Sequence, residues 1–411
     1  MRLLHTSDWH LGQNFKGYDR HAEHRAFMDW LLDLLAQRQI DALLISGDIF
    51  DQANPSAEAQ RLFYGFLAQA RARCTALDIV VIAGNHDSAA RIEAPHPILL
   101  GLGVHVVGQF NARLPLDEEM LQRLCIPLHR ADGGVGAWAL AVPFLRAGDL
   151  ASAQGDSYGA GIAETYRRIV DAAAERRQPD QALVGMGHLH VQGASVSSDS
   201  ERRLVIGGEE ALDAGIFPAE LTYVALGHLH KPQTLGEGRL RYCGSPLPLS
   251  YSEIDYLHQV VEIELGGATV ISTKAHLIPR PALILRVPAK PLPLDEALAE
   301  LRELTVDDAP EGLEPLIEVQ ILASLAPTDM RARVDEALAG KKIRLTGITR
   351  TSPQPATASA DETTSPRLAM EDLQPERLFQ RLLDEHPGID NPDELHAAFA
   401  ELLQGAYEED A

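Results

Sequence analysis

Residues 2–10 read RLLHTSDWH, an apolar run (Arg2–Ser7) that ends in the polar residues Asp8 and His10. Runs of four to eight mostly aliphatic residues that end in polar loops are typical of buried β-strands. Before the next run, apolar residues at positions 27, 30, 31, 34 and 35 follow one face of a helix. Further runs of the same kind are Ala42–Ser46, Ile79–Ala83, Trp138–Val142, Ala182–Met186 and Leu221–Leu226. Strands that alternate with helical segments predict an α/β fold.

Five of these runs are followed directly by short polar motifs. The motifs are Asp8-Trp9-His10, Gly47-Asp48-Ile49-Phe50-Asp51, Gly84-Asn85-His86-Asp87, Gly187-His188 and Gly227-His228-Leu229-His230. Because loops at the carboxyl ends of buried strands converge in α/β folds, residues far apart in sequence can share one site. Each motif alone is common without a ligand, but five in this order indicate a single functional centre.

The residue types in these motifs indicate a metal centre. Aspartate oxygens, imidazole nitrogens and an Asn carbonyl suit manganese, iron or zinc better than a calcium cage or a thiolate site. A carboxylate can bridge two cations, and two cations about 3.5–4 Å apart can activate water and stabilise an in-line phosphoryl displacement. The glycines would allow the backbone to pass close to the metals.

The order of the motifs resembles that of the calcineurin-like metallophosphoesterases, and the surrounding sequence resembles their SbcD nuclease branch. The similar stretches are HTSDWHLGQ (residues 5–13), SGDIFD (46–51), AGNHDS (83–88), GHLHVQGAS (187–195), YVALGHLHKPQ (223–233) and YCGSPLPLSYSE (242–253). The resemblance is strong over roughly residues 1–260 and covers the remainder by layout only.

This resemblance implies an α/β architecture with several parts. A metallophosphoesterase β-sandwich flanked by helices would span residues 1–277, with two late strands, Val260–Leu265 and Thr269–Thr273, around the turn at Gly266–Gly267. A small α+β capping domain would follow over residues 278–350, and its pattern reads strand, helix, strand, helix, strand. Residues 351–367 are rich in Ser, Thr, Ala and Pro, which is typical of a flexible linker. Residues 368–411 would form a two-helix tail.

Position by position, the resemblance implies these roles. One metal would be held by Asp8, His10, Asp48 and His230. The other would be held by Asp48, Asn85, His188 and His228, with Asp48 bridging. His86 would contact the scissile phosphate and protonate the leaving oxygen, and Asp51 would orient His86. The sequence GHLH occurs twice, so His190 could also chelate, but the family uses only the first histidine of the earlier copy.

The activity that the resemblance implies is that of a manganese-dependent DNA nuclease with two Mn²⁺, for which Mg²⁺, Fe²⁺ or Zn²⁺ could substitute. It would act as a 3′-to-5′ exonuclease on duplex ends and as an endonuclease on single strands or hairpins, in DNA repair, recombination and replication. The chain has no GxxxxGK[ST] phosphate loop. ATP dependence would come from an SbcC-type ABC ATPase with a long coiled coil, two copies of each protein forming a heterotetramer.

Two regions outside the motifs suggest partners. Residues 330–350 are locally basic, and Lys341, Lys342 and Arg344 would contact DNA; the alternative is a solvated charged face. In the tail, residues 375–385 and 392–407 predict short amphipathic helices with Leu and Phe stripes. Such short helices are marginal alone. The stripes would therefore dock on the ATPase, the alternative being packing on the nuclease domain.

The composition excludes several classes of protein. A formal net charge of −23 argues against coating nucleic acid by bulk electrostatics. Cys74, Cys125 and Cys243 form neither a CxxC pair nor a disulfide framework. The absence of a signal sequence and of a long apolar stretch predicts a cytoplasmic protein. Two other functions stay open: a phosphatase or phosphodiesterase for small substrates, and a scaffold protein with an inactive site.

Overall fold

The computed structural model describes residues 1–150, 157–197, 201, 211–323 and 329–352, with the single positions Phe379, Leu395 and Phe399. The chain divides into two compact units, Met1–Pro353 and Gln354–Ala411. The predicted linker and tail lie outside the described residues, apart from residues 351 and 352 and those three positions. In the second unit the rings of Phe379 and Phe399 stack with centroids 4.0 Å apart.

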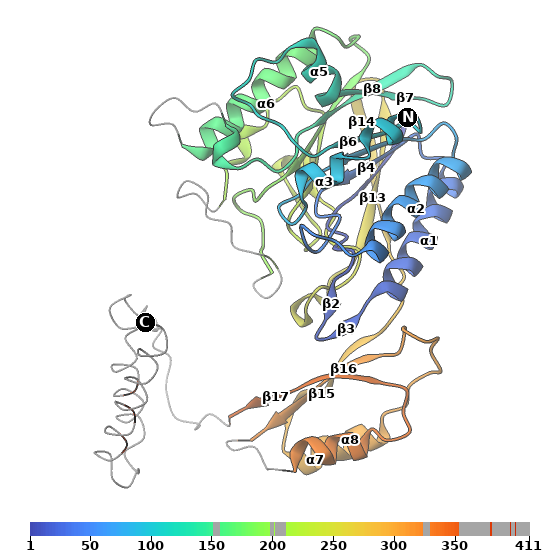
Figure 1. The fold of residues 1–411 in the computed structure, drawn as a ribbon, viewed down its shortest axis with the longest axis vertical. Helices are drawn as coiled ribbons and strands as arrows, with labels where there is room; N and C mark the ends of the chain where they lie inside the picture. Colours follow the sequence, from blue (N-terminus) through green and yellow to red (C-terminus); the bar gives the residue numbers. More distant parts are fainter. Residues whose placement is uncertain are drawn as a thin grey trace. The chain divides into compact units, whose positions relative to one another are not determined.

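The first of two six-stranded sheets contains the N-terminal run (Figure 1). Its strands, in order across the sheet, are β14 (Thr269–Leu277), β13 (Gln259–Gly266), β1 (Arg2–Thr6), β4 (Ala42–Ser46), β5 (Asp78–Ile82) and β6 (Val104–Val107). Strands β1, β4, β5 and β6 are parallel to one another. Strand β13 pairs antiparallel with both β1 and β14. The loops after β1, β4 and β5 therefore leave the same edge.

The second sheet supplies the other two motifs. Its strands, in order, are β11 (Gln233–Leu235), β12 (Leu240–Tyr242), β10 (Tyr223–Gly227), β9 (Ala182–His188), β8 (Val135–Ala141) and β7 (Cys125–His129). The four central strands are parallel, and the edge strands β11 and β7 are antiparallel to their neighbours. Strands β9 and β10 are adjacent and end in the two GHLH sequences.

Alternate residues of the first sheet enter different cores. Leu3 and Leu44 pack in the core shared with the second sheet. Leu4 and Leu43 pack on the outer face, against α1 (His21–Arg38) and α2 (Ala57–Arg73). The strands are apolar on both faces because both faces are covered. The remaining helices of this domain are α3 (Ala89–Glu93), α4 (His96–Leu100), α5 (Glu118–Leu124) and α6 (Tyr158–Ala174), of which α6 packs on the second sheet.

The capping domain has a separate core. Its strands β15 (Ile284–Leu292), β16 (Leu316–Leu322) and β17 (Arg344–Thr351) form a parallel three-stranded sheet. Helices α7 (Leu294–Glu303) and α8 (Met330–Ala337) alternate with these strands. Both helices pack their apolar residues against β16.

The capping domain contacts the sandwich domain through a small mixed cluster. A short hairpin, β2 (Asn14–Phe15) and β3 (Tyr18–Asp19), places Phe15 against Tyr251. Both pack with Ile284 and Leu316 of the capping domain. The Tyr251 hydroxyl lies 2.6 Å from the Thr346 hydroxyl oxygen. The loop that contains Tyr251 thus contributes both to the apolar cluster and to the hydrogen bond with Thr346.

The structure confirms the predicted fold class. The strands and the helix that the sequence predicts within residues 2–277 are observed to within a few residues at each end, whereas β2, β3, β6, β7, β11, β12 and helices α2 to α6 were not predicted. The β-sandwich, its flanking helices and the strand–helix alternation of the capping domain are all present. Within the described residues, no helix combines the length and apolar character needed to cross a bilayer.

Candidate metal centre

The five motifs meet where the carboxyl ends of the two sheets face each other. The Asp8 amide donates to the Gly47 carbonyl at 3.0 Å, and the His10 amide donates to the Asp48 carbonyl at 3.0 Å. From the second sheet, the His228 amide donates to Oδ1 of Asp8 at 2.9 Å. These hydrogen bonds, two between main-chain atoms and one to the Asp8 carboxylate, hold the loops of β1, β4 and β10 in one cluster. The seven predicted ligands all lie in this cluster.

The first group of ligands consists of Asp8, His10 and His230. Their candidate ligand atoms all lie within 4.8 Å of one another, and all three residues are buried. Nδ1 of His230 lies 2.8 Å from Oε1 of Glu253, which leaves Nε2 as the ligand atom. Burial lowers the pKa of His230, but Glu253 and the neighbouring acids outweigh it and raise the pKa to about 9.

The second group consists of Asp48, His188 and His228, with Asn85 beside them. Nδ1 of His188 donates to the Ser46 carbonyl at 2.9 Å, which leaves Nε2 for a metal. Oδ1 of Asn85 lies 3.0 Å from Nε2 of His188 and 3.0 Å from Nδ1 of His228. These three atoms therefore surround one small volume.

Asp48 lies between the two groups. Its Oδ2 is 3.3 Å from Nε2 of His188 and 3.7 Å from Nε2 of His10. Burial raises the pKa of Asp48, but the adjacent His188 and His10 lower it by a larger amount. The net pKa is therefore below the usual value, and the carboxylate is ionised. Conversely, burial lowers the pKa of His188 while Asp48 and Asp8 raise it to about 9. Burial and the His188 charge keep the pKa of His228 well below its usual value.

His10 indicates that the cluster is built to hold a cation. Both of its ring nitrogens are buried and have no hydrogen-bond partner among the described residues. The carboxylate oxygens nearest to them are Oδ1 of Asp51 at 3.4 Å and Oδ2 of Asp48 at 3.7 Å. Buried polar atoms are normally paired, and a metal ligand is the usual role of a neutral imidazole beside carboxylates. The residues present therefore fit a divalent metal site.

Two glycines permit this close packing. A Cβ atom on Gly84 would collide with the Asp48 side chain, and one on Gly47 would collide with the His188 ring. Gly47 also has a φ of +86°, which other residues rarely adopt. The glycines of the two motifs thus bring the loops after β4 and β5 within reach of one metal.

His86 and Asp51 lie at the edge of the cluster. The His86 amide donates to Oδ1 of Asp48 at 2.8 Å, and Nδ1 of His86 lies 2.8 Å from the main-chain carbonyl oxygen of Asp51. The Asp51 main chain thus makes one contact that orients the ring. The Asp51 carboxylate also lies near His10, and its role toward His86 stays a prediction. His86 also shares a possible ligand set with His10 and Asp48, so its role as an acid stays a prediction.

Sequence reasoning missed two carboxylates that organise the cluster. Glu253 binds Nδ1 of His230 with one oxygen and accepts the Leu249 amide at 2.7 Å with the other. Asp87 accepts the amides of Ile49, Phe50 and Gly84 at 2.9–3.1 Å, and so ties the loops after β4 and β5 together. Burial and the nearby Asp48 raise the pKa of Asp87 to about 6. Their only sequence signal was their place inside GNHD and YCGSPLPLSYSE.

The predicted DNA-contacting cations are engaged within the protein. Nζ of Lys341 donates to the carbonyls of Arg302 at 3.0 Å and Leu304 at 2.6 Å, at the end of α7. Lys342 pairs with Asp308 at 2.5 Å. The Arg344 guanidinium donates to the Glu314 carbonyl at 2.7 and 2.9 Å, and its side chain is only 11% exposed. Their role in DNA binding stays a prediction.

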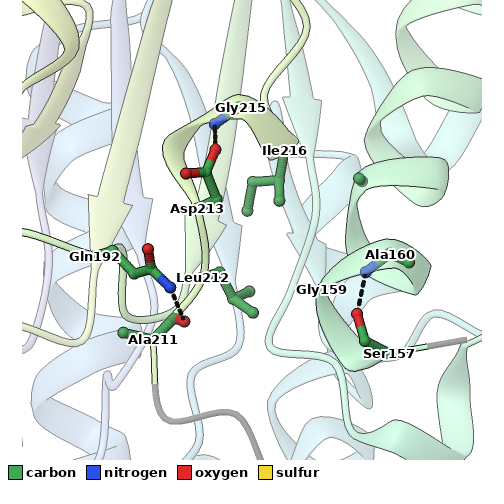
Figure 2. Close-up of a pocket in the computed structure, with 10 residues that line it drawn as sticks. Ser157, Gly159, Ala160, Gln192, Ala211, Leu212, Asp213, Gly215 and Ile216 are labelled. Carbon is green, nitrogen blue, oxygen red and sulfur yellow. Dashed lines mark hydrogen bonds between the residues drawn. The ribbon is translucent and has the colours of Figure 1, made fainter.

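Two other features are separate from the cluster. His190 belongs to none of the possible ligand sets among the described residues. A hollow of about 710 Å³ lies between the start of α6 and residues 211–216 (Figure 2). Of the described residues that line it, Asp213 alone is charged, and its Oδ1 accepts the Gly215 amide at 2.7 Å. This carboxylate stabilises the turn, and none of the other described lining residues is ionisable.

Comparison with known proteins agrees with this geometry. The family model for calcineurin-like phosphoesterases matches residues 1–232. The SbcD protein of the SbcCD nuclease from Rhodobacter capsulatus is 42% identical over 387 residues, which cover 92% of this chain and 93% of that protein. The chain belongs to the SbcD family of calcineurin-like phosphoesterases.

Other members of the SbcD family match over a shorter region. The SbcD proteins of Escherichia coli K12 and Bacillus subtilis 168 are 38% and 35% identical over 273 residues. These matches cover 63% and 64% of this chain, and 64% and 66% of the two proteins. A second family model, described as the type 5 capsule protein repressor C-terminal domain, matches residues 283–386. Family membership supports a hydrolytic, metal-dependent enzyme with a divalent metal site.

Proposed function

We propose that the chain is a two-metal DNA nuclease, the nuclease component of an ATP-dependent complex that processes DNA ends. The observation that carries this proposal is the position of Asp48 between two ligand groups, Asp8–His10–His230 and Asn85–His188–His228. Each group offers a mixed oxygen and nitrogen set that suits Mn²⁺, with Fe²⁺, Zn²⁺ or Mg²⁺ as competitors. The relatives, which are named as parts of the SbcCD nuclease, support DNA as the substrate.

The bound metals would polarise the scissile phosphate and lower the pKa of an attacking water. The chain itself positions the acid. A carbonyl oxygen can only accept a hydrogen bond, so Nδ1 of His86 carries a proton toward Asp51. The proton for the leaving oxygen would then come from Nε2. The His86 amide is fixed to Asp48, so the acid and the bridging ligand move together.

The test of this proposal compares wild type with His86→Gln. Metal analysis of the purified chain at saturating manganese should give two ions per chain for both proteins. Cleavage of linear duplex DNA and of a hairpin should fall by roughly two to four powers of ten in the variant, as expected for a lost general acid. Loss of metal from the variant would make His86 a ligand. One ion or none in wild type would exclude the two-metal mechanism.

Substrate class is tested by the same preparation. A nuclease should cleave DNA with Mn²⁺ and show 3′-to-5′ polarity on duplex ends labelled at either strand terminus. A phosphatase for small substrates would hydrolyse a chromogenic phosphodiester but leave DNA intact. A scaffold protein would bind metal and hydrolyse neither. The three outcomes are therefore distinct.

The partner would be an SbcC-type ATPase, in keeping with the names of the relatives. The predicted tail helices carry Leu and Phe stripes that suit helix-in-groove docking. Truncation after Ser365 should abolish co-purification with the ATPase and leave the manganese-dependent activity of the isolated chain. If the truncated chain binds the ATPase as tightly as the full chain does, the tail is not the tether.

A further inference from the structure

A second hollow, of about 620 Å³, lies beside the metal centre. Asn85 forms part of its wall, so the hollow begins at the second ligand group. Phe144 and Arg146, from the loop after β8, line another part, and small residues such as Ser88 and Gly108 leave room between them. The volume falls within the roughly 300–1,000 Å³ typical of ligand pockets. We call this the Phe144 hollow.

Phe144 is fixed relative to the metal ligands. Its amide donates to the Ala83 carbonyl at 2.9 Å, two residues before Asn85. Its ring centroid lies 6.4 Å from that of His188, with the rings nearly perpendicular. The side chain is half-buried and lines the hollow. An aromatic ring is thus presented next to the position of a scissile phosphate.

Arg146 adds a positive charge at the same place. Its guanidinium lies over the Phe144 ring, 5.9 Å from the centroid. In the described part of the chain it forms no ion pair with an acidic side chain, whereas Arg123 in the same hollow is paired with Glu93. The Asp149 carboxylate also lines the hollow and accepts the Arg146 main-chain amide at 2.8 Å, but it forms no ion pair with the guanidinium. An exposed cation without an ion pair beside the metal centre suits a phosphate, which would be repelled elsewhere by a chain of net charge −23.

We propose that the Phe144 hollow binds the nucleotide next to the scissile phosphate, with the base stacked on Phe144 and the next phosphate paired with Arg146. Stacking accepts every base, because each has a π-face, and so it suits an enzyme that processes ends of any sequence. The proposal rests on the proposed nuclease function and adds the subsite that orients the strand.

The test places abasic sites along the substrate. With Mn²⁺, kcat/KM is measured for wild type and Phe144→Leu on single-stranded oligonucleotides that carry one abasic site at successive positions around the cut. Phe144→Leu should lower kcat/KM about 5–100-fold on intact DNA, as expected for one lost stacking contact. At one position the abasic site should slow wild type by the same factor and leave Phe144→Leu unchanged. Phe144→Trp should restore most of the activity.

A binding measurement gives a readout without turnover. In the His86→Gln background, 2-aminopurine at the position identified above should be quenched on binding, and Phe144→Leu should remove the quenching. Arg146→Gln should lower the slope of log affinity against log salt by about one, whereas Arg91→Gln, on α3 outside the hollow, should not.

Three results would overturn the proposal. One is an equal effect of abasic sites on wild type and Phe144→Leu at every position. Another is an equal loss by Phe144→Leu on methyl p-nitrophenyl phosphate, which has no base and would show that the ring only supports the metal ligands. The third is unchanged 2-aminopurine fluorescence. If wild type itself fails to cut DNA, the proposed function fails instead, so the two failures are distinguishable.

Discussion

In the metal centre, His10 has two buried ring nitrogens without a hydrogen-bond partner in the described part of the chain, whereas in the capping domain Lys341 donates to two carbonyls at the end of α7. The histidines of the centre crowd together, with the ring centroids of His10 and His86 only 4.8 Å apart. The cations of the capping domain are instead separated, each beside its own acid or carbonyl. One region leaves its polar groups available for a ligand, and the other uses them internally.

This difference teaches which charged residues can be interpreted as functional. Residues 330–350 are basic in sequence, but five of their six cations, Arg331, Arg333, Lys341, Lys342 and Arg344, already have partners in the fold. Arg146 is an isolated cation in sequence, and within the described residues its guanidinium contacts the Phe144 ring and forms no ion pair, although Asp149 accepts its main-chain amide. A buried or exposed polar group without a partner is therefore a better sign of a site than a local excess of charge.

The largest effect should come from Asp48→Ala. It removes the carboxylate placed between both ligand groups, and metals supply several kcal/mol of charge stabilisation, so cleavage should fall by roughly four powers of ten or more. Metal analysis should show loss of at least one ion while circular dichroism stays that of wild type. Retention of two ions and of activity would mean that the cluster does not act as one centre.

A smaller effect is expected from Glu253→Gln. The carboxylate fixes the tautomer of His230, and loss of such a partner typically weakens metal affinity about 10–100-fold. Titration with Mn²⁺ followed by calorimetry would measure this change. Ser252→Ala serves as the control, because within the described residues the Ser252 hydroxyl hydrogen-bonds to Ser250 on the same loop and to no residue of the metal centre. If both variants bind Mn²⁺ like wild type, the Glu253 contact is structural.

Arg344→Ala and Lys342→Ala compare a buried and an exposed cation of the capping domain. Arg344 donates twice to the Glu314 carbonyl and lies 3.8 Å from Glu23, so its loss should destabilise the fold by about 1–3 kcal/mol. Lys342 is 61% exposed and its pair with Asp308 is screened by solvent, so its loss should leave stability nearly unchanged. Urea unfolding would measure both changes. Equal losses of stability in the two variants would show that burial does not decide how much each cation contributes.

Lys342 is then the clean probe for DNA contact. If it binds a phosphate, Lys342→Ala should lower the salt dependence of DNA affinity by about one unit of slope without affecting stability. Fluorescence anisotropy at several salt concentrations would provide the slope. An unchanged slope would assign Lys342 to the Asp308 pair alone.

A pH-dependent effect is expected at Glu262, where the nuclease domain also pairs its charges internally. The hydrogen bonds from Arg38, at 2.8 and 2.9 Å, and from His276 at 2.7 Å lower the pKa of Glu262 to about 2. Since the folded pKa lies below the unfolded value near 4.5, the stabilisation is present above pH 4.5 and is lost between about pH 4.5 and 2. Glu262→Gln should cost about 1–2 kcal/mol at pH 7, after allowance for solvent screening of Arg38. In this variant the free energy of unfolding should also depend less on pH between about pH 4.5 and 2. As a control, Glu264→Gln should change neither the stability at pH 7 nor this pH dependence.

Much of the fold could be predicted because its strands are buried on both faces. Ala42–Ser46 was predicted to the residue, since aliphatic runs of that length have few alternatives. Helix α2 has the same apolar spacing as α1, at Phe63, Phe66 and Leu67, and the same rule applies to it. The two-residue strands β2 and β3 are too short to show a period, so only the structure reveals the hairpin.

The ligand motifs were accessible to sequence reasoning because each follows its own strand, but partners from elsewhere in the chain were not. Glu253 lies 23 residues after His230, and Asp308 lies 34 residues before Lys342. Nothing in local composition indicates such pairs. The contact of the Asp51 carbonyl with His86 also depends on the path of the loop, and side-chain type alone suggested only the carboxylate.

Four of the proposed ligands, Asp8, His10, Asp48 and His228, have positive φ angles of 54°, 46°, 48° and 99°. For residues other than glycine such a conformation costs on the order of 1 kcal/mol or more each. The metal centre is consequently a region of backbone strain in an otherwise well-packed sandwich. Bound metal ions would offset the free-energy cost of that strain. A lineage that lost the metals would gain from glycine at these four positions, because glycine relaxes the backbone while alanine keeps the strain. In a relative of this fold, glycine at the four positions would therefore indicate that metal binding and enzymatic activity have been lost.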